Sequence, residues 1–419
     1  MSTPAERVAP LVEHFFRHEA GRLVAVLTRL FGFRHFDLVE ETVQATLVMA
    51  LQSWRTRGLP ENPAGWIHRV AKNRVLDALR RAEIAERAGA EWARARPAGT
   101  EGIDHLFMET QIEDSQLRLM FACCHPVLAL EDQLALTLKA LCGFGNAEIA
   151  RALLITEEAA KKRVQRAREQ LVAAQIALEP PPAEELTQRL DSVHQALYLL
   201  FNEGYSATQG EAAIRADLCE EAARLCFLLC SHRECSGPAT FALMALMLFH
   251  ASRLQARLDH AGSVLLMEEQ DRGRWDARLM HRAKEFLDEA AAGKIVSPFH
   301  LEAGIALIHC SAPSYAETNW RAIVNLYDAL LVIRPSPIYQ LNRAIALAEL
   351  EGPHAGIAAL MDDRVAEALR HYHLYDATLG ELHRRTGDLR RARRYLLLAK
   401  AKTKSAADQE ILNRRLAKC

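Results

Sequence analysis

The chain has 419 residues, half of them hydrophobic, and a formal net charge of −1 at pH 7. This length allows two or three domains with cores of their own, and a charge near zero excludes a generally basic surface for nucleic acid. No uninterrupted apolar run approaches the roughly 18 to 20 residues of a membrane span, and the N-terminus lacks the pattern of a signal peptide. We therefore expect a cytoplasmic protein without membrane contact, whose cysteines are reduced thiols.

Helical spacing of Ala, Leu, Arg and Glu dominates the chain, and alternating β-branched runs are absent. The predicted fold class is therefore all-α. We expect a first helical domain over residues 4–81, a flexible linker over 82–102 marked by Pro97 and Gly99, and a second helical domain over 103–178. A Pro-rich spacer over 179–183 is the clearest boundary, and a third helical domain follows over 184–419.

Residues 58–81, GLPENPAGWIHRVAKNRVLDALRR, predict a Pro- and Gly-containing loop followed by a two-faced helix. The basic and polar side of this helix carries Arg69, Lys72, Asn73 and Arg80. Apolar residues fall opposite, namely Ile67, Val70, Ala71, Val75 and Ala78, while Leu76 lands among the basic ones. Either a DNA reader anchored to a core or an ordinary amphipathic helix with a solvated face gives this pattern.

Residues 145–171 predict two helices joined by a tight turn, with Asn146 capping the first helix and Thr156 the second. An apolar stripe on the second helix comprises Ala160, Val164, Ala167 and Leu171. The opposite face presents Glu158, Lys162, Gln165, Arg166 and Glu169. This is the arrangement of a helix-turn-helix, whose second helix enters the major groove of DNA.

The exposed face of that second helix carries side chains with the donors and acceptors that bases require. Lys162 and Arg166 suit guanine, Gln165 suits adenine, and Glu158 suits the amino group of cytosine. The flanking residues expected to hold phosphates are Lys161, Arg163 and Arg168. A helix hairpin with a solvated charged face remains the alternative at this motif.

The last third of the chain shows a degenerate repeat. Small residues, among them Gly380, Ala392 and Ala399, recur at intervals close to the roughly 34 residues of tetratricopeptide units. The pattern predicts tetratricopeptide-like helix pairs from about residue 300, although any array of helix pairs fits it. Residues 184–297 are predicted to be helical without a period.

Two groups of cysteine and histidine residues suggest metal sites only weakly. Cys226, Cys230, His232 and Cys235 do not have a standard zinc spacing, and three adjacent residues, 123–125, cannot easily turn to one ion. We expect these thiols to pack in the core, with no metal and no cofactor. Because no phosphate loop, nucleophile elbow or HExxH motif is present, we also expect no enzymatic activity.

Two basic helices about 90 residues apart, joined by a connector, resemble the sigma factors of bacterial RNA polymerase. The likeness covers about residues 8–175 and is closest to the extracytoplasmic-function type, group IV of the sigma-70 family. It implies that the first domain is region 2, which binds the polymerase clamp and melts the −10 element. The second domain then corresponds to region 4, which reads the −35 element through its helix-turn-helix.

Residue by residue, the run over 36–54 looks like the clamp-binding part of region 2. It implies polymerase clamp contacts from Asp37, Glu40, Glu41, Val43 and Gln44, with Ala45 where the family usually has Glu. The helix ending at 81 closely resembles the one that faces the −10 element, which implies contacts from Arg69, Lys72, Asn73, Asp77, Arg80 and Arg81. The loop over 57–65 looks like the segment that pockets a flipped base, and Trp66 is expected to pack in the core.

The long C-terminal extension is similar to that of a sigma subfamily with a tetratricopeptide-like extension. It suggests regulation in cis, or through a protein or peptide bound in the groove between stacked helix pairs. The implied partners are core RNA polymerase and promoter DNA. The alternative is a helix-turn-helix regulator or scaffold that binds a protein partner and never contacts polymerase.

Overall fold

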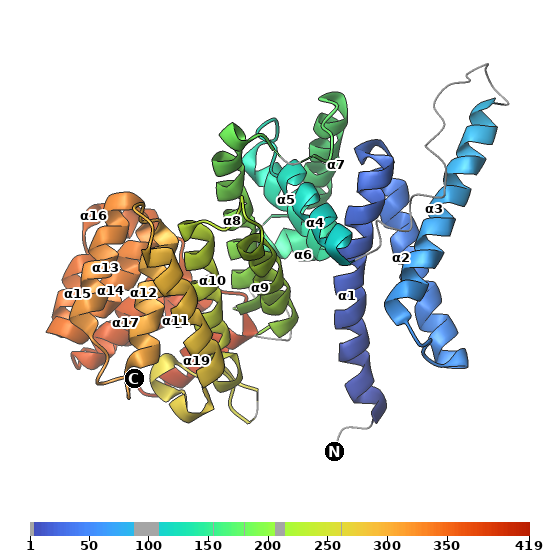
Figure 1. The fold of residues 1–419 in the computed structure, drawn as a ribbon. Helices are drawn as coiled ribbons and strands as arrows, with labels where there is room; N and C mark the ends of the chain where they lie inside the picture. The colour runs from blue at the N-terminus through green and yellow to red at the C-terminus, as the bar shows by residue number, and fades with distance from the viewer. Residues whose placement is uncertain (1–3, 88–108, 154, 180, 206–213, 261) are drawn as a thin grey trace. The chain divides into compact units, whose positions relative to one another are not determined.

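The computed structural model describes residues 4–87, 109–153, 155–179, 181–205, 214–260 and 262–419. Every regular element among these residues is a helix, apart from an isolated bridge between Leu258 and Val264 (Figure 1). The predicted all-α class is therefore confirmed. Within the described ranges no helix is long and apolar enough to cross a membrane.

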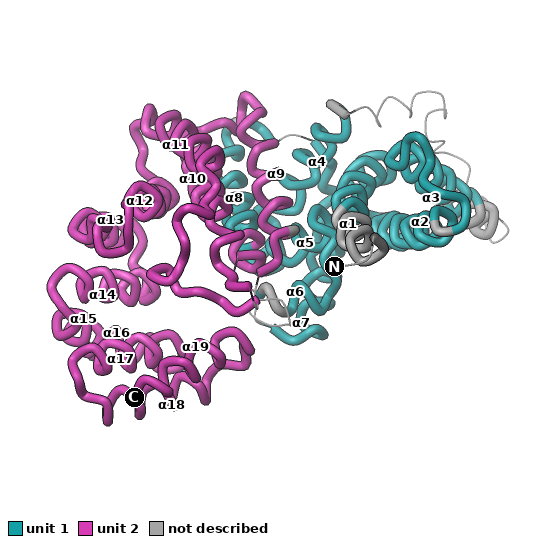
Figure 2. The backbone as a smooth tube through the Cα atoms, turned by 90° about the horizontal axis from the view of Figure 1, so that it is seen from below, with its two compact units in different colours: residues 1–199 teal, residues 200–419 magenta. Residues whose placement is uncertain are grey.

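Contacts divide the chain into two compact units, residues 1–199 and 200–419 (Figure 2). The division falls inside α8 (Ala183–Tyr205), which begins directly after the Pro-rich stretch. The sequence placed the boundary in that stretch, at 179–183. The difference arises because the start of α8 packs with the first unit, where Arg189 Nη1 donates to the carbonyl oxygen of Phe121 at 3.5 Å.

The first unit is built around one long helix, α1. This helix packs against α2 and α3 and also against α4 and α5. Gly21 marks the tightest contact, since a Cβ added there would lie 2.1 Å from the carbonyl oxygen of Leu141 at the end of α5. The elements of this unit are α1 (Pro4–Phe31), η1 (Phe33–His35), α2 (Phe36–Arg57), α3 (Pro63–Arg87), α4 (Glu109–Cys123), α5 (Leu130–Cys142), α6 (Asn146–Ala152) and α7 (Glu157–Ala173).

Helix α3 continues past the expected domain end at residue 81 and stops at Arg87. Residues 82–87, AEIAER, are good helix formers, so nothing in this stretch ends the helix early. The predicted linker over 82–102 is therefore wrong in its first part. Its remainder, with Pro97 and Gly99, lies outside the described residues.

The second unit consists of helices that pack against their neighbours in the chain. Small residues allow the close approach: a Cβ added to Gly380 on α17 would lie 2.7 Å from Leu396 Cγ on α18, and one added to Gly356 would lie 2.7 Å from Ala348 Cβ. This pairing agrees with the predicted helix pairs, while the tetratricopeptide likeness stays a prediction. The helices are α9 (Ala216–Ser231), α10 (Pro238–Ala251), α11 (Ala277–Ala291), α12 (Pro298–Ser311), α13 (Trp320–Ile333), α14 (Pro337–Glu351), α15 (Pro353–Leu360), α16 (Asp363–Leu369), α17 (His373–Arg385), α18 (Leu389–Lys402) and α19 (Ala406–Leu416).

Residues 252–276, which we call the α10–α11 arm, contain the short helices η4 (Leu254–Ala256), η5 (Met267–Glu269) and η6 (Arg272–Arg274). Arg272 Nη1 donates to the carbonyl oxygens of His309 at 2.6 Å and Ala312 at 2.8 Å, at the end of α12. Arg414 on α19 donates to the carbonyl oxygen of Val264 at 2.6 Å. The arm is thus joined to α19 near its middle and to the end of α12 near its C-terminal end.

Candidate nucleic-acid and protein interface

Helix α3 begins at Pro63, three residues earlier than the predicted loop over 57–65 allowed. Asn62 caps it, because its side chain accepts a hydrogen bond from the backbone N–H of Gly65 at 2.9 Å. The apolar side is anchored as expected: Ile67 and Val75 are fully buried. The loop before the helix, residues 58–62, exposes Leu59 to solvent.

Trp66 packs inside the first unit, as predicted. Its ring meets Trp54 edge-on with centroids 5.8 Å apart, and Trp54 lies 5.5 Å from Phe16. These three rings tie α1, α2 and α3 together at the start of α3. Trp66 is therefore part of the support under the exposed face of α3.

A buried charge fixes α3 to α1. His68 Nε2 on α3 lies 2.7 Å from Glu19 Oε2, and both side chains are buried. Burial alone raises the pKa of Glu19, but hydrogen bonds with His18 and His68 and the charge of Arg22 outweigh it and lower the pKa to about 2. The carboxylate therefore stays ionised and holds the register of α3 on α1.

The polar face of α3 is accessible. Arg69, Asn73, Asp77 and Arg80 are exposed and Lys72 is half-buried, as the sequence indicated. Arg80 Nη1 and Asp77 Oδ1 form an ion pair at 3.6 Å, one turn apart. Arg81 lies in the helix, but its side chain is outside the described set.

Arg74 belongs to the same surface and was missed from the sequence. It is exposed and lines a cleft of about 410 Å³ between α2 and α3, together with Glu41, Ala45 and Asp77. Its neighbour in sequence, Val75, points into the core, which is the signal that would have placed Arg74 at the edge of the exposed face.

Helix α2 presents a stripe of polar and apolar side chains to solvent, which we call the α2 face. It comprises Asp37, Glu41, Gln44, Val48 and Leu51, all exposed and spaced by three or four residues. Val48 is 53% and Leu51 41% exposed, and neither was predicted. Their positions follow from continuing the spacing of Asp37, Glu41 and Gln44.

The prediction that Val43 contacts the clamp is wrong. Val43 is completely buried, as are Val39 and Ala50 on the same side of α2. These residues form the inner stripe of the helix, so Val43 has no surface to offer. Glu40, between the two stripes, is half-buried.

The helix-turn-helix is present as α6 and α7. Thr156 caps α7 by accepting a hydrogen bond from the N–H of Ala159 at 3.2 Å, as predicted. The predicted apolar stripe is fully confirmed, since the buried residues of α7 are Ala160, Val164, Ala167 and Leu171. The prediction for Asn146 is wrong: it is the first helical residue, and Glu148 Oε2 accepts from the N–H of Gly145 instead, at 2.9 Å.

Most of the predicted base- and phosphate-contacting residues of α7 lie on its surface. The exposed ones are Glu158, Lys161, Lys162, Gln165 and Arg166, and Arg163 is half-buried. Two of them hold neighbours on the same helix. Lys162 Nζ lies 3.5 Å from Glu158 Oε1, and Gln165 Nε2 donates to Glu169 Oε1 at 2.9 Å.

Arg166 has a different role from the predicted base contact. Its Nε donates to Asp132 Oδ2 at 2.7 Å and its Nη2 to Oδ1 at 2.5 Å. Asp132, on α5, is 1% exposed, so releasing Arg166 would leave a buried carboxylate without its cation. Arg166 therefore fastens α7 to α5, and the prediction that it reads guanine is not supported by this geometry.

The two predicted interfaces touch each other. Arg168 on α7 forms a two-pronged ion pair with Asp37 on the α2 face, and Lys139 on α5 pairs with Glu40. The Arg168 guanidinium also lies 5.7 Å from the centre of the Phe36 ring. Beside these pairs a cleft of about 380 Å³ includes Lys161 and Gln165 in its lining. Two of the five residues predicted to bind polymerase, Asp37 and Glu40, are thus engaged by the helix-turn-helix region, a contact that no local sequence pattern could indicate.

The cysteines that suggested zinc are mostly structural. Cys226 is buried on the inner side of α9 and Cys230 is half-buried, while Cys235 is buried beyond the end of α9, with His232 Nδ1 3.5 Å from its sulfur. Among the described residues no three potential ligands are grouped to hold a metal ion.

Comparison with known proteins shows that the segments carrying these surfaces match known protein families. Residues 15–83 match a family model described as Sigma-70 region 2, and residues 118–171 match Sigma-70, region 4. Residues 189–291 match a family of unknown function, DUF6596. An uncharacterized protein of Rhizobium meliloti (strain 1021) is 37% identical over 357 residues, which cover 85% of this chain and 84% of that protein. No solved structure matches the chain.

Proposed function

Because the chain belongs to the sigma-70 family, as an extracytoplasmic-function sigma factor with a C-terminal extension, we propose that its described surfaces divide the steps of promoter-specific initiation among them. Members of this family are transcription initiation factors, which bind core RNA polymerase and promoter DNA, and they are not enzymes. The alternative of a regulator that never contacts polymerase is not supported, since region 2 is matched as well as region 4. The protein acts in the cytoplasm, where polymerase works.

The α2 face is the surface for core polymerase. Its N-terminal half offers carboxylates at Asp37 and Glu41, and its C-terminal half exposes Val48 and Leu51. Two large aliphatic side chains exposed on the same helix face as acidic residues are typical of a protein-binding surface. This stripe is the observation that carries the proposal for polymerase binding.

The exposed face of α3 contacts the −10 element and the exposed face of α7 the −35 element. Arg69, Asn73 and Arg80 are open to solvent on an element held rigidly by the Glu19–His68 pair. On α7, Lys162 and Gln165 serve base edges, while Lys161 and Arg163 hold phosphates. Arg81 stays a proposed −10 contact by its position in the helix.

A binding and transcription experiment with full-length protein tests the polymerase surface. Glu41→Lys and Val48→Lys are expected to weaken binding to core RNA polymerase by at least about tenfold, or about 1.4 kcal/mol, and to reduce run-off transcription equally. Glu113→Lys, an exposed charge reversal on α4, is the matched control and should leave both unchanged. Unaltered core binding in both α2 variants would contradict this function for the α2 face.

The contact between the helix-turn-helix region and α2 is a closed, resting arrangement. Asp37 and Glu40 cannot serve the polymerase while Arg168 and Lys139 hold them. Arg168, which the sequence assigned to phosphates, is held by Asp37 and is not free for them, whereas Lys161 stays exposed. Initiation therefore requires the region 4 helices to part from α1 and α2 in the first unit.

The second unit regulates this step. The relative in Rhizobium meliloti aligns over 357 residues, far more than the first unit contains, so the extension is shared between the two proteins. Its paired helices enclose a concave surface of the kind that repeat proteins use for binding. Initiation by the unaltered chain should therefore respond to whatever occupies that surface.

A further inference from the structure

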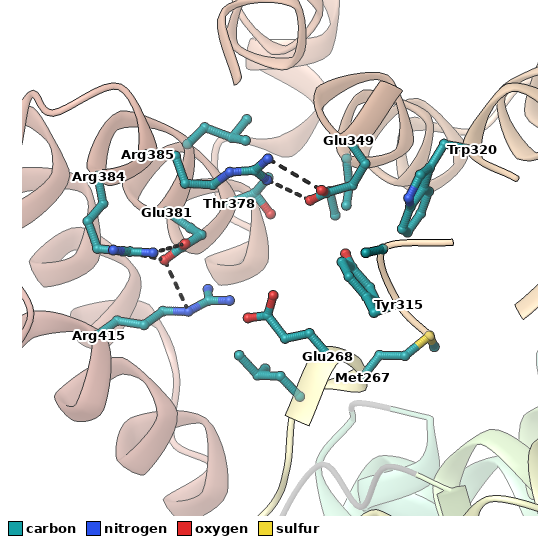
Figure 3. Close-up of a pocket in the computed structure, with 14 residues that line it drawn as sticks. Met267, Glu268, Tyr315, Trp320, Glu349, Thr378, Glu381, Arg384, Arg385 and Arg415 are labelled. Atoms are coloured by element: carbon teal, nitrogen blue, oxygen red, sulfur yellow. Dashed lines mark hydrogen bonds and ion pairs between the residues drawn. The ribbon is translucent and has the colours of Figure 1, made fainter. Parts of the chain in front are cut away.

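The second unit contains an open cavity of about 630 Å³ on the inner side of its helix pairs. Side chains from α13, α14, α17 and α19 line it, and η5 of the α10–α11 arm closes one side (Figure 3). This volume lies within the range of about 300 to 1,000 Å³ typical of small-molecule sites. One of these helices, α19, is joined to the arm by the hydrogen bond from Arg414 to the carbonyl oxygen of Val264.

Two ion pairs stiffen the walls. Arg385 Nη1 donates to Glu349 Oε1 at 2.5 Å and its Nη2 to Oε2 at 3.3 Å. Arg384 binds Glu381 in the same two-pronged way, with distances of 3.1 Å from Nε and 2.7 Å from Nη2. These two pairs hold α14 and α17 side chains in place along the cavity wall, and Glu381 is also within ion-pair distance of Arg415.

Two further charges in the cavity have unused hydrogen-bonding capacity. Among the described residues, Arg415 forms only a long ion pair, from Nε to Glu381 Oε2 at 3.6 Å, with a carboxylate that it shares with Arg384, and its Nε makes no hydrogen bond. In Figure 3 the carboxylate of Glu268 on η5 points toward the Arg415 guanidinium, but it forms no ion pair with Arg415 and accepts no hydrogen bond from any described residue. The Arg415 guanidinium and the Glu268 carboxylate thus line the same cavity without forming an ion pair with each other.

An aromatic wall stands beside them. The rings of Tyr315 and Trp320 meet edge to face with centroids 5.1 Å apart, and both line the cavity. Burial and the charges of Glu349 and Glu268 raise the pKa of Tyr315, so its hydroxyl remains a donor to Glu349. The wall therefore offers a fixed apolar surface next to the two open charges.

We infer that this cavity binds a small zwitterion of the amino-acid class, with its carboxylate on Arg415, its ammonium on Glu268, and an apolar side chain against Trp320 and Tyr315. The cavity holds three glutamates and three arginines, so a ligand with net charge gains little there, whereas one with separated opposite charges satisfies both open groups. Binding stands on the cavity alone. Its effect on initiation rests on the proposed function and makes the extension a metabolite sensor.

The direct test is a titration of the full-length chain without polymerase. L-Phenylalanine, L-tyrosine and L-leucine are the zwitterionic probes, read by calorimetry and by the fluorescence of the chain's tryptophans. Phenylpropionate, which lacks the amine, and phenethylamine, which lacks the carboxylate, should bind roughly tenfold to a hundredfold more weakly than phenylalanine, since each loses one charged hydrogen-bonded contact. Equal binding of phenylalanine and either half-molecule would overturn the assignment, as would no saturation by any of the common amino acids at about 10 mM.

Variants identify the two contacts separately. Arg415→Gln should abolish the preference for phenylalanine over phenethylamine, and Glu268→Gln the preference over phenylpropionate. Arg390→Gln on α18 and Glu410→Gln on α19, both exposed and away from the cavity lining, are matched controls that should keep both preferences. Preferences unchanged in Arg415→Gln and Glu268→Gln contradict the site, even where polymerase binding by the α2 face is upheld.

Discussion

Gly21→Ala tests whether the closed arrangement of the first unit exists in solution. A methyl group at Gly21 would lie 2.1 Å from the carbonyl oxygen of Leu141 and 3.1 Å from its carbonyl carbon. The atom in the way is backbone at the end of α5, so it cannot swing aside as a long side chain can. Alanine therefore requires α5 to retreat from α1 by about an ångström, and overpacking of this kind costs typically 1–3 kcal/mol.

Helix propensity alone predicts that Gly21→Ala stabilises the protein, opposite to the effect of the clash. In a helix interior, Gly→Ala stabilises by about 1 kcal/mol, and this gain is present whether or not α5 is docked. The clash is present only in the closed arrangement. The equilibrium should therefore move toward the open form by a factor of about 5 to 150. Because polymerase binds the open form, apparent core affinity should rise by up to that factor when the closed form dominates.

Hydrogen exchange of the full-length chain measures the opening, and titration with core polymerase measures the gain in affinity. Gly304→Ala in α12 is the matched control, because its added methyl group would meet only the end of the Leu326 side chain, at 3.3 Å. Amides at the α1–α5 contact should exchange faster in Gly21→Ala and at the normal rate in Gly304→Ala. Unchanged or slower exchange at these amides in Gly21→Ala, with unchanged core affinity, would mean that α1 and α5 are not in contact in solution.

Three further predictions concern the ion pairs that hold α3 and α7 in place and the side chains proposed to contact DNA. Glu19→Gln should lower the free energy of unfolding by about 3 kcal/mol at pH 7, because the pKa of Glu19 is lowered from 4.5 to about 2. The difference from the unaltered protein should shrink as pH falls from about 4.5 toward 2 in urea titrations, since the ionised carboxylate supplies the stability. Asp132→Ala and Arg166→Ala should reduce thermal stability and all −35 binding together, without a change in base preference. Lys162→Ala should lose about 1–3 kcal/mol of discrimination at one −35 base pair, whereas Arg80→Ala should weaken promoter binding uniformly and reduce the salt slope by about one.

Local sequence patterns correctly predicted the features of helices that depend only on residues close in sequence, such as buried stripes and N-terminal caps. The buried stripe of α7 and its Thr156 cap follow from spacings of three or four residues, and both are present in the structure. The basic face of α3 was predicted for the same reason. In α2, where apolar residues lie on two sides, the family resemblance implied a clamp contact from Val43, which is buried, while Val48 is exposed. A period of 3.6 residues identifies stripes but not which of two apolar stripes meets the core.

Long-range pairs could not be predicted from the sequence. Arg166 and Asp132 are 34 positions apart, and Arg168 and Asp37 are 131 apart, so no spacing rule connects them. The consequence is functional, because each pair redirects a side chain that the sequence assigned to DNA or polymerase. Arg415 and Glu268 are likewise far apart in sequence, and they line one cavity only because the α10–α11 arm folds next to α19.

The closed arrangement combines two kinds of contact with different consequences for initiation. The ion pairs of Asp37 and Glu40 lie near the surface, where such pairs contribute only about 0–1 kcal/mol, and polymerase can replace their cations with its own. The close packing of α1 on the backbone of Leu141 at Gly21 exists only in the closed form, and all of it is lost when α5 separates from α1. In the proposed function, the ion pairs therefore orient the region 4 helices on α2, while the α1–α5 packing sets how much free energy polymerase must supply to separate them.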